Sequence, residues 1–150
     1  TCGAVSPEAE INDCLLSESV YSESNFAYTY NNYDKHVVVA DKALNDSVLK
    51  AAEELNLNST LHKGMLTTMD VFGPYIDFDR VLDRIPKKYH VLGEEMEAFA
   101  LIHIANSMNR QATAIATVVD SKFSDVVLSI EERQTSLNNM IKLALEAIIK

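Results

Sequence analysis

Three carboxylates, Glu94, Glu95 and Glu97, crowd the start of the otherwise apolar stretch GEEMEAFALIHIA. Acidic side chains in the first turn of a helix are stabilised by its free N–H groups and its dipole, by about 0.3–1 kcal/mol each. This reading accounts for Glu94 and Glu95. Glu97 lies one turn before Leu101, where the predicted helix faces inward, and a carboxylate held there needs hydrogen-bond donors. The vicinal hydroxyls of a polyol ligand are donors of this kind.

Asp120 and Arg133 are a second candidate pair. Asp120 ends the apolar run ATAIATVVD, where a partly desolvated carboxyl has a raised pKa and can act as a general acid. The alternative is a solvated strand end or the cap of a turn. Arg133 stands in the first turn of the last predicted helix, where a cation opposes the helix dipole. It pairs either with Glu131 or Glu132 at the surface, or with Asp120 or a substrate.

Phe72 precedes Gly73 and Pro74 in the stretch DVFGP. An aromatic residue is more often part of the core, but in a loop its ring can stack on the flat ring of a ligand. The sequence has no glycine-rich phosphate loop, no nucleophile elbow and no metal-binding cluster. The histidines show no ligand spacing, so we expect neither a metal nor an organic cofactor.

The composition limits the classes of partner. The 150 residues are 47% hydrophobic, which fits one domain, residues 1–150, with its own core. Acidic residues outnumber basic ones by 22 to 13, which argues against nucleic acid and anionic membranes as partners. No apolar run is long enough to cross a bilayer. Cys2 and Cys14 are too few for a disulfide framework or a zinc site, so we expect a reducing, cytoplasmic compartment.

Hydrophobic periodicity predicts alternating strands and helices. Strands are expected at residues 13–21, 36–41, 60–70 and 112–120, with a polar loop at 22–34. Helices are expected at 43–56, in a short segment that ends near Pro86, and at 94–108. A last helix starts at the capping box of Ser129 and Glu132. Its predicted inner face consists of Leu137, Met140, Ile141, Ala144, Leu145 and Ile148.

This alternation predicts an α/β fold with a mixed, mostly parallel central sheet flanked by helices. In open α/β sheets, ligands bind at the carboxyl ends of the strands. We therefore expect the candidate acidic residues to gather at one edge of the sheet.

Several blocks, taken in order, resemble a known family. GEEMEA, ATVVDS and ERQTSLNNMIKLALEAI resemble the bacterial-type hexameric purine nucleoside phosphorylases of the nucleoside phosphorylase superfamily. The opening TCGAV resembles their phosphate-side strand and turn, and TMDVF their base-stacking segment. Uridine phosphorylases and nucleosidases share the E-M-E element, but the Asp–Arg pair of VVDS and ERQT favours the purine enzymes. The resemblance runs through all 150 residues and implies a three-layer fold and a homo-oligomer, a trimer of dimers.

The resemblance also implies a reaction. Phosphate, a co-substrate, attacks C1′ of a purine ribonucleoside, and the products are the free base and ribose 1-phosphate. Asp120 matches the acid that protonates N7 of the departing purine, and Arg133 the residue that assists it. Glu97 matches the carboxylate that binds the ribose 2′ and 3′ hydroxyls, and Phe72 the ring against the base. The remaining predicted residues are Met96, Glu95, Glu94, Cys2 and Gly3 for substrate binding and Thr1 for phosphate binding.

The sequence departs from the family pattern in three respects. Val119 replaces the usual serine before the acid, and Glu94 occupies a position that is commonly apolar, so the choice between 6-amino and 6-oxo purines stays open. The chain begins without Met, and the family's N-terminal segment, which carries arginines for phosphate, is not in it. We therefore interpret the sequence as the C-terminal part of such an enzyme. The alternatives are a nucleoside-binding protein without catalysis, and a hydrolase that uses water in place of phosphate.

Overall fold

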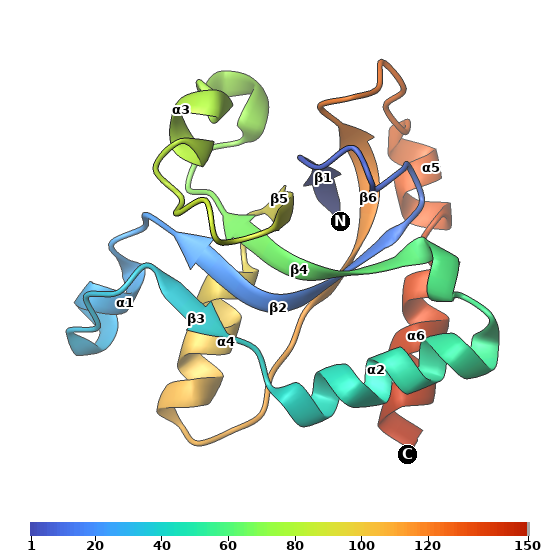
Figure 1. Cartoon of the computed structure of the whole chain (residues 1–150), viewed down its shortest axis with the longest axis horizontal. Helices are drawn as coiled ribbons and strands as arrows, with labels where there is room; N and C mark the ends of the chain where they lie inside the picture. The colour runs from blue at the N-terminus through green and yellow to red at the C-terminus, as the bar shows by residue number, and fades with distance from the viewer. Residues whose placement is uncertain (150) are drawn as a thin grey trace.

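Six strands pair in the order β3-β2-β4-β5-β1-β6, and β6 also pairs with β2, so the sheet curves until it closes on itself (Figure 1). The computed structural model describes residues 1–149. The strands are β1 (Cys2–Ala4), β2 (Cys14–Ser22), β3 (Val37–Val39), β4 (Leu61–Thr68), β5 (Val91–Glu95) and β6 (Ile115–Ser121). The helices are α1 (Phe26–Asn31), α2 (Lys42–Leu55), η1 (Asn58–Thr60), η2 (Gly73–Tyr75), α3 (Phe78–Leu82), α4 (Ala98–Ser107), α5 (Ile130–Thr135) and α6 (Asn138–Ile149).

The predicted α/β fold with a mixed sheet is confirmed. Parallel pairs join β2 to β4, β4 to β5 and β1 to β6, whereas β2–β3, β1–β5 and β2–β6 are antiparallel. The longest pairing, β2 with β4, is parallel. The closure of the sheet was not predicted from the sequence. No helix among residues 1–149 is long and apolar enough to span a membrane.

Strand β2 separates two parts of the core. Leu15 and Leu16 are both fully buried, and they face opposite sides because side chains alternate along a strand. Leu15 packs with Phe99 and Ile102 of α4, whereas Leu16 packs against α2 and α6. Figure 1 shows α2 and α6 together on one side of the sheet, away from α4. Both faces of the strand are therefore apolar, as in a strand covered on two sides.

The predicted helix at 94–108 is wrong at its start. Residues 91–95 form β5, which pairs with β4 and β1, and helix α4 begins at Ala98. Glu94 and Glu95 are thus strand residues and do not belong to the first helical turn. The explanation by helix electrostatics fails for Glu94, whereas the side chain of Glu95 still reaches the first N–H groups of α4. Pairing on both edges of β5 overrides the weak strand propensity of glutamate. The helix is also less buried than predicted, because Leu101 is exposed.

Two further predictions need correction. The polar segment 22–34, predicted as a loop, contains α1. The last helix is divided into α5 and α6, and half of its predicted inner face is exposed: Ile141, Leu145 and Ile148 face outward. The side chains that pack against α2 are Met140, as predicted, together with Leu143 and Ala147, which were not predicted.

Candidate active site

Gly3 stands in a row with two carboxylates across three neighbouring strands. It lies opposite Glu94 in the antiparallel pair β1–β5 and next to Asp120 in the parallel pair β1–β6. A Cβ atom at Gly3 would lie 2.5 Å from Oδ1 of Asp120 and 3.3 Å from Oε1 of Glu94. Only glycine leaves room for both side chains, so the register of the sheet brings two distant carboxylates to one place.

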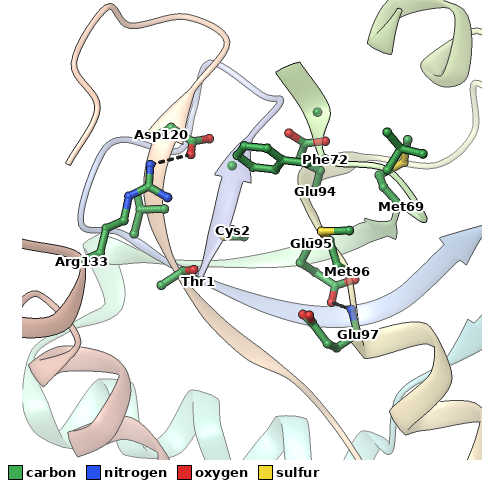
Figure 2. A pocket seen from close by; sticks show the side chains of 14 residues that line it. Thr1, Cys2, Met69, Phe72, Glu94, Glu95, Met96, Glu97, Asp120 and Arg133 are labelled. Carbon is green, nitrogen blue, oxygen red and sulfur yellow. Dashed lines mark hydrogen bonds and ion pairs between the residues drawn. The ribbon is translucent and has the colours of Figure 1, made fainter. Parts of the chain in front are cut away.

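A cavity of about 160 Å³ opens beside this row, and every site residue predicted from the sequence lines it (Figure 2). Those residues are Thr1, Cys2, Gly3, Phe72, Glu94, Glu95, Met96, Glu97, Asp120 and Arg133. A neighbouring cavity of about 630 Å³ shares Phe72, Gly73, Glu94, Asp120 and Arg133 with it. The acidic residues thus gather in one place, as expected, but not at a shared edge of the sheet, because β5 and β6 run in opposite directions on either side of β1.

Four lining residues were not predicted as part of the site: Met69, Val71, Gly73 and Val119. They follow or precede predicted residues closely in the sequence. In the sequence, Gly73 could have been identified only by its place directly after Phe72. The structure shows why glycine is needed there: a Cβ atom would collide with the carboxylate of Glu94. The apolar residues Met69 and Val71 give no chemical signal in the sequence, whereas Val119 had already drawn notice as the residue that replaces the usual serine before Asp120.

Arg133 contacts Asp120, as one of its two interpretations required. Its Nη2 donates to Oδ2 of Asp120 at 3.4 Å, and its Nε donates to the carbonyl oxygen of Leu128 at 2.9 Å. The capping box of Ser129 and Glu132, confirmed by the structure, starts α5 and sets the position of Arg133. Burial raises the pKa of Asp120, and the guanidinium of Arg133 opposes that rise.

Glu95 fixes the turn between β5 and α4. Its Oε2 accepts hydrogen bonds from the backbone N–H groups of Glu97 at 2.7 Å and Ala98 at 2.6 Å. Its Oε1 accepts one from the hydroxyl of Thr68, which in turn accepts from the N–H of Phe99 at 2.9 Å. This carboxylate therefore satisfies the first N–H groups of α4, a role that a side chain at the cap position normally has. Its predicted role in substrate binding stays a prediction.

Glu97 and Met96, in contrast, face the cavity. Both are exposed, and no residue among 1–149 donates a side-chain or backbone hydrogen bond to the carboxylate of Glu97. Figure 2 shows Glu97 at the end of the pocket away from Asp120. Glu95 holds the backbone of Glu97 and thereby fixes the position of the Glu97 side chain. The carboxylate of Glu97 therefore presents unused hydrogen-bond acceptors to a ligand.

Phe72 is not a core residue. Its side chain is 48% exposed, and its ring meets that of Tyr75 edge-on at 6.1 Å between centroids. Figure 2 shows the ring, in this view, between the carboxylate of Asp120 and that of Glu94. An exposed ring in this place offers a flat surface for stacking.

Glu94 has a buried carboxylate oxygen, Oε2, without a hydrogen-bond partner among the described residues. Burial raises the pKa of Glu94, and the negative charge of Asp120 raises it further. Burial also raises the pKa of the Cys2 thiol to about 12, which rules out a thiolate nucleophile at neutral pH. No group of His, Cys, Asp and Glu within residues 1–149 is arranged to hold a metal ion.

The model of the family described as "Phosphorylase superfamily" matches residues 1–150. The chain belongs to the phosphorylase superfamily. It is similar to curated relatives named purine nucleoside phosphorylase DeoD-type, with 33% identity to the protein of Oceanobacillus iheyensis, 30% to that of Buchnera aphidicola and 31% to that of Dichelobacter nodosus. These matches cover 99–100% of the chain but only 61–62% of each relative. This phosphorylase-superfamily chain thus spans about three fifths of the length of the relatives it matches.

Proposed function

We propose that the complete protein is a purine nucleoside phosphorylase, a pentosyltransferase of nucleoside metabolism and purine salvage that converts purine ribonucleosides and phosphate reversibly to free base and ribose 1-phosphate. The observation that supports this most directly is one cavity with two chemically different ends. A carboxyl with a raised pKa and an arginine partner stands at one end, and an exposed carboxylate with unused acceptors stands at the other. The names of the relatives agree with this proposal.

The reaction requires an acid at the base. A purine anion is a poor leaving group, so protonation at N7 lowers the barrier to cleavage of the glycosidic bond. An ordinary aspartic acid, with a pKa of about 3.9, is ionised at neutral pH. Burial keeps more of Asp120 protonated, and we assign it the transfer of its proton to N7. Arg133, already in contact with Asp120, stabilises the carboxylate that this transfer leaves behind.

The reaction also requires that the sugar be held while phosphate attacks C1′. We assign to Glu97 the hydrogen bonds from the 2′ and 3′ hydroxyls, because its carboxylate has acceptors to spare. Met96 packs on the sugar, and Phe72 stacks on the purine. Thr1 contributes a hydroxyl to phosphate, and Cys2 and Gly3 line the pocket between base and ribose. This binding would hold the reacting atoms in a favourable orientation.

Phosphate is a co-substrate in this scheme, and no cofactor takes part. The three-layer fold, the homohexamer built as a trimer of dimers, and the cytoplasmic location are part of the same proposal. The outward-facing Ile141, Leu145 and Ile148 of α6 support contact with further polypeptide, because large apolar side chains gathered on one helix face are otherwise exposed to water.

The test uses the complete protein with radiolabelled phosphate and either inosine or adenosine. Labelled ribose 1-phosphate is the expected product, and the Asp120→Asn variant should form it about 10²–10⁴ times more slowly. Nucleoside binding in calorimetry with no turnover would instead indicate a binding protein. Free ribose released in phosphate-free buffer would indicate a hydrolase. Either result would overturn the proposal.

A further inference from the structure

Glu94 is a polar side chain whose function is not explained by the mechanism above. Resting on the proposed function, we propose that Glu94 determines base specificity: its carboxylate accepts a hydrogen bond from the exocyclic amino group of a 6-aminopurine, so the site prefers adenosine to 6-oxopurine nucleosides. The proposal names the substrate class for the same cavity and depends on where Glu94 and Asp120 stand relative to each other.

The two carboxyls flank a single glycine. Gly3 pairs with Glu94 on one side and with Asp120 on the other, and an oxygen of each carboxyl group would contact a Cβ atom placed on it. Both residues line the cavity of about 160 Å³ and the larger cavity beside it. A flat ring that enters above Gly3 and lies against Phe72 therefore meets both carboxyls along one edge.

Glu94 also lacks an internal partner. Its Oε2 is buried without a hydrogen bond from any described residue, and its Oε1 faces Gly73, which has no side chain. Arg133 donates hydrogen bonds to Asp120 and to the carbonyl oxygen of Leu128, and none to Glu94. Leaving a buried polar group without a partner costs about 1–3 kcal/mol, and a ligand donor would recover this cost.

Two neighbouring carboxyls in a partly desolvated site do not both ionise readily, so the pair holds one proton more easily than none. The proposed reaction needs that proton on Asp120, from which it passes to N7. In that state Glu94 is ionised and can only accept hydrogen bonds. The proton on one carboxyl thus determines which groups the other carboxyl can recognise.

The purine edge next to N7 is the 6-position. A 6-amino group donates a hydrogen bond, which an ionised Glu94 accepts while Asp120 donates to N7. A 6-oxo group presents lone pairs to the same carboxylate, and it is accepted only if the proton moves to Glu94, which leaves Asp120 unable to protonate N7. For adenosine, the state with the proton on Asp120 serves both binding and catalysis. For inosine, binding needs the proton on Glu94, whereas catalysis needs it on Asp120.

The experiment compares adenosine with inosine in the complete protein. We expect kcat/KM for adenosine to exceed that for inosine by about 10²-fold, the range of one hydrogen bond to a charged group. Glu94→Gln, which offers an amide donor as well as an acceptor, and Glu94→Val, which offers neither, should bring this ratio below about 10. Glu10→Gln, which changes an exposed carboxylate outside the cavity, is the matched control and should leave the ratio unchanged.

Binding of the free bases provides a second measurement that does not depend on turnover. Adenine should bind the wild-type protein more tightly than hypoxanthine in calorimetry, and Glu94→Val should remove most of the difference. Equal kcat/KM for the two nucleosides, or a ratio that Glu94→Val leaves unchanged, would overturn the specificity proposal while leaving the phosphorylase function intact. Absence of turnover with both nucleosides would overturn the function, and the binding comparison would still decide the role of Glu94.

Discussion

Arg133 and Asp120 meet across the edge of the cavity, with Nη2 of the arginine 3.4 Å from Oδ2 of the aspartate, although they come from α5 and β6. The contact is polar and only partly shielded, since each side chain is about 30% exposed. It therefore adjusts the proton affinity of Asp120 more than it stabilises the fold. Burial and the guanidinium act on the pKa of Asp120 in opposite directions.

Replacing Arg133 should change the pH profile in a defined direction. Activity that needs a protonated Asp120 is lost as the pH rises through its pKa. Because Arg133 favours the ionised form, Arg133→Gln should raise the pKa of Asp120 further and move this basic limb of kcat/KM to higher pH. At the optimum, kcat should fall by about 10²-fold, because the carboxylate left after proton transfer loses its partner.

The control for this change is Arg110→Gln, which removes an exposed arginine outside the cavity. Its profile of kcat/KM against pH should match that of the wild-type protein. A basic limb that stays in place or moves to lower pH in Arg133→Gln would contradict the assigned relationship between Arg133 and Asp120.

Glu95 and Glu97 should differ sharply in their effect on stability. Glu95→Gln places an amide N–H₂ where N–H and O–H donors converge, and it should lower the free energy of unfolding by about 2–3 kcal/mol. Glu97→Gln changes an exposed side chain and should alter it by less than about 0.5 kcal/mol. Urea unfolding of the two variants measures the difference, and equal losses would contradict the capping role of Glu95.

Glu97 should instead affect sugar recognition. Glu97→Gln should lower kcat/KM for a purine ribonucleoside by about 10²-fold, because hydroxyl groups lose a charged acceptor. The loss should be smaller for the 2′-deoxynucleoside, which has one hydroxyl fewer to offer. Calorimetry with the free base is the control, and the affinity for the base should not change. A weakened affinity for the base would place Glu97 at the wrong end of the pocket.

The candidate site could be predicted from the sequence more fully than the fold. Asp120, Arg133 and Glu97 stand out in the sequence because a charged side chain beside an apolar run loses hydration and needs a partner or a ligand. All three line one cavity. The sequence pattern did not predict that Glu94 and Glu95 are strand residues. Strand β5 is paired on both edges, with β1 and β4, and is therefore stabilised by distant parts of the chain. The local pattern of hydrophobic residues does not depend on these contacts and cannot predict them.

The buried face of the last helix could not be predicted from the sequence either. Helical spacing alone gives two adjacent apolar faces in α6, one with Leu143 and one with Leu145. Which face is buried depends on where α2 lies, and the structure has Leu143 inside and Leu145 exposed. The capping box was predictable because its two residues, Ser129 and Glu132, are three positions apart in the sequence and need no distant part of the chain.

Glu94 should make stability depend on pH. Its pKa is raised in the folded protein, so between about pH 4.3 and that raised value the folded state binds more protons than the unfolded state. The contribution of Glu94 to stability is thus present at low pH and is lost as the pH rises. Relative to the wild-type protein, the free energy of unfolding and the Tm of Glu94→Gln should rise between about pH 5 and about pH 8, because glutamine has no charged form to bury. Thermal unfolding at both pH values measures this gain, and a constant difference would contradict it.

Gly3→Ala should disturb the site through a single methyl group. The new Cβ would lie 2.5 Å from Oδ1 of Asp120, closer than non-bonded atoms approach, and β1 cannot move away because β5 and β6 pair with it on both sides. Asp120 must therefore turn out of place, and kcat/KM should fall by about 10²-fold or more. The strain should also lower the free energy of unfolding by about 1–3 kcal/mol.

A double-mutant cycle separates this collision from a general weakening of β1. In an Asp120→Ala background the carboxyl group is gone, so Gly3→Ala should cost at least about 1 kcal/mol less than it does in the wild-type protein. Urea unfolding of the two single variants and the double variant gives the coupling energy. If Gly3→Ala costs the same in both backgrounds, the glycine is required by the strand itself, and the shared space of Gly3 and Asp120 does not explain it.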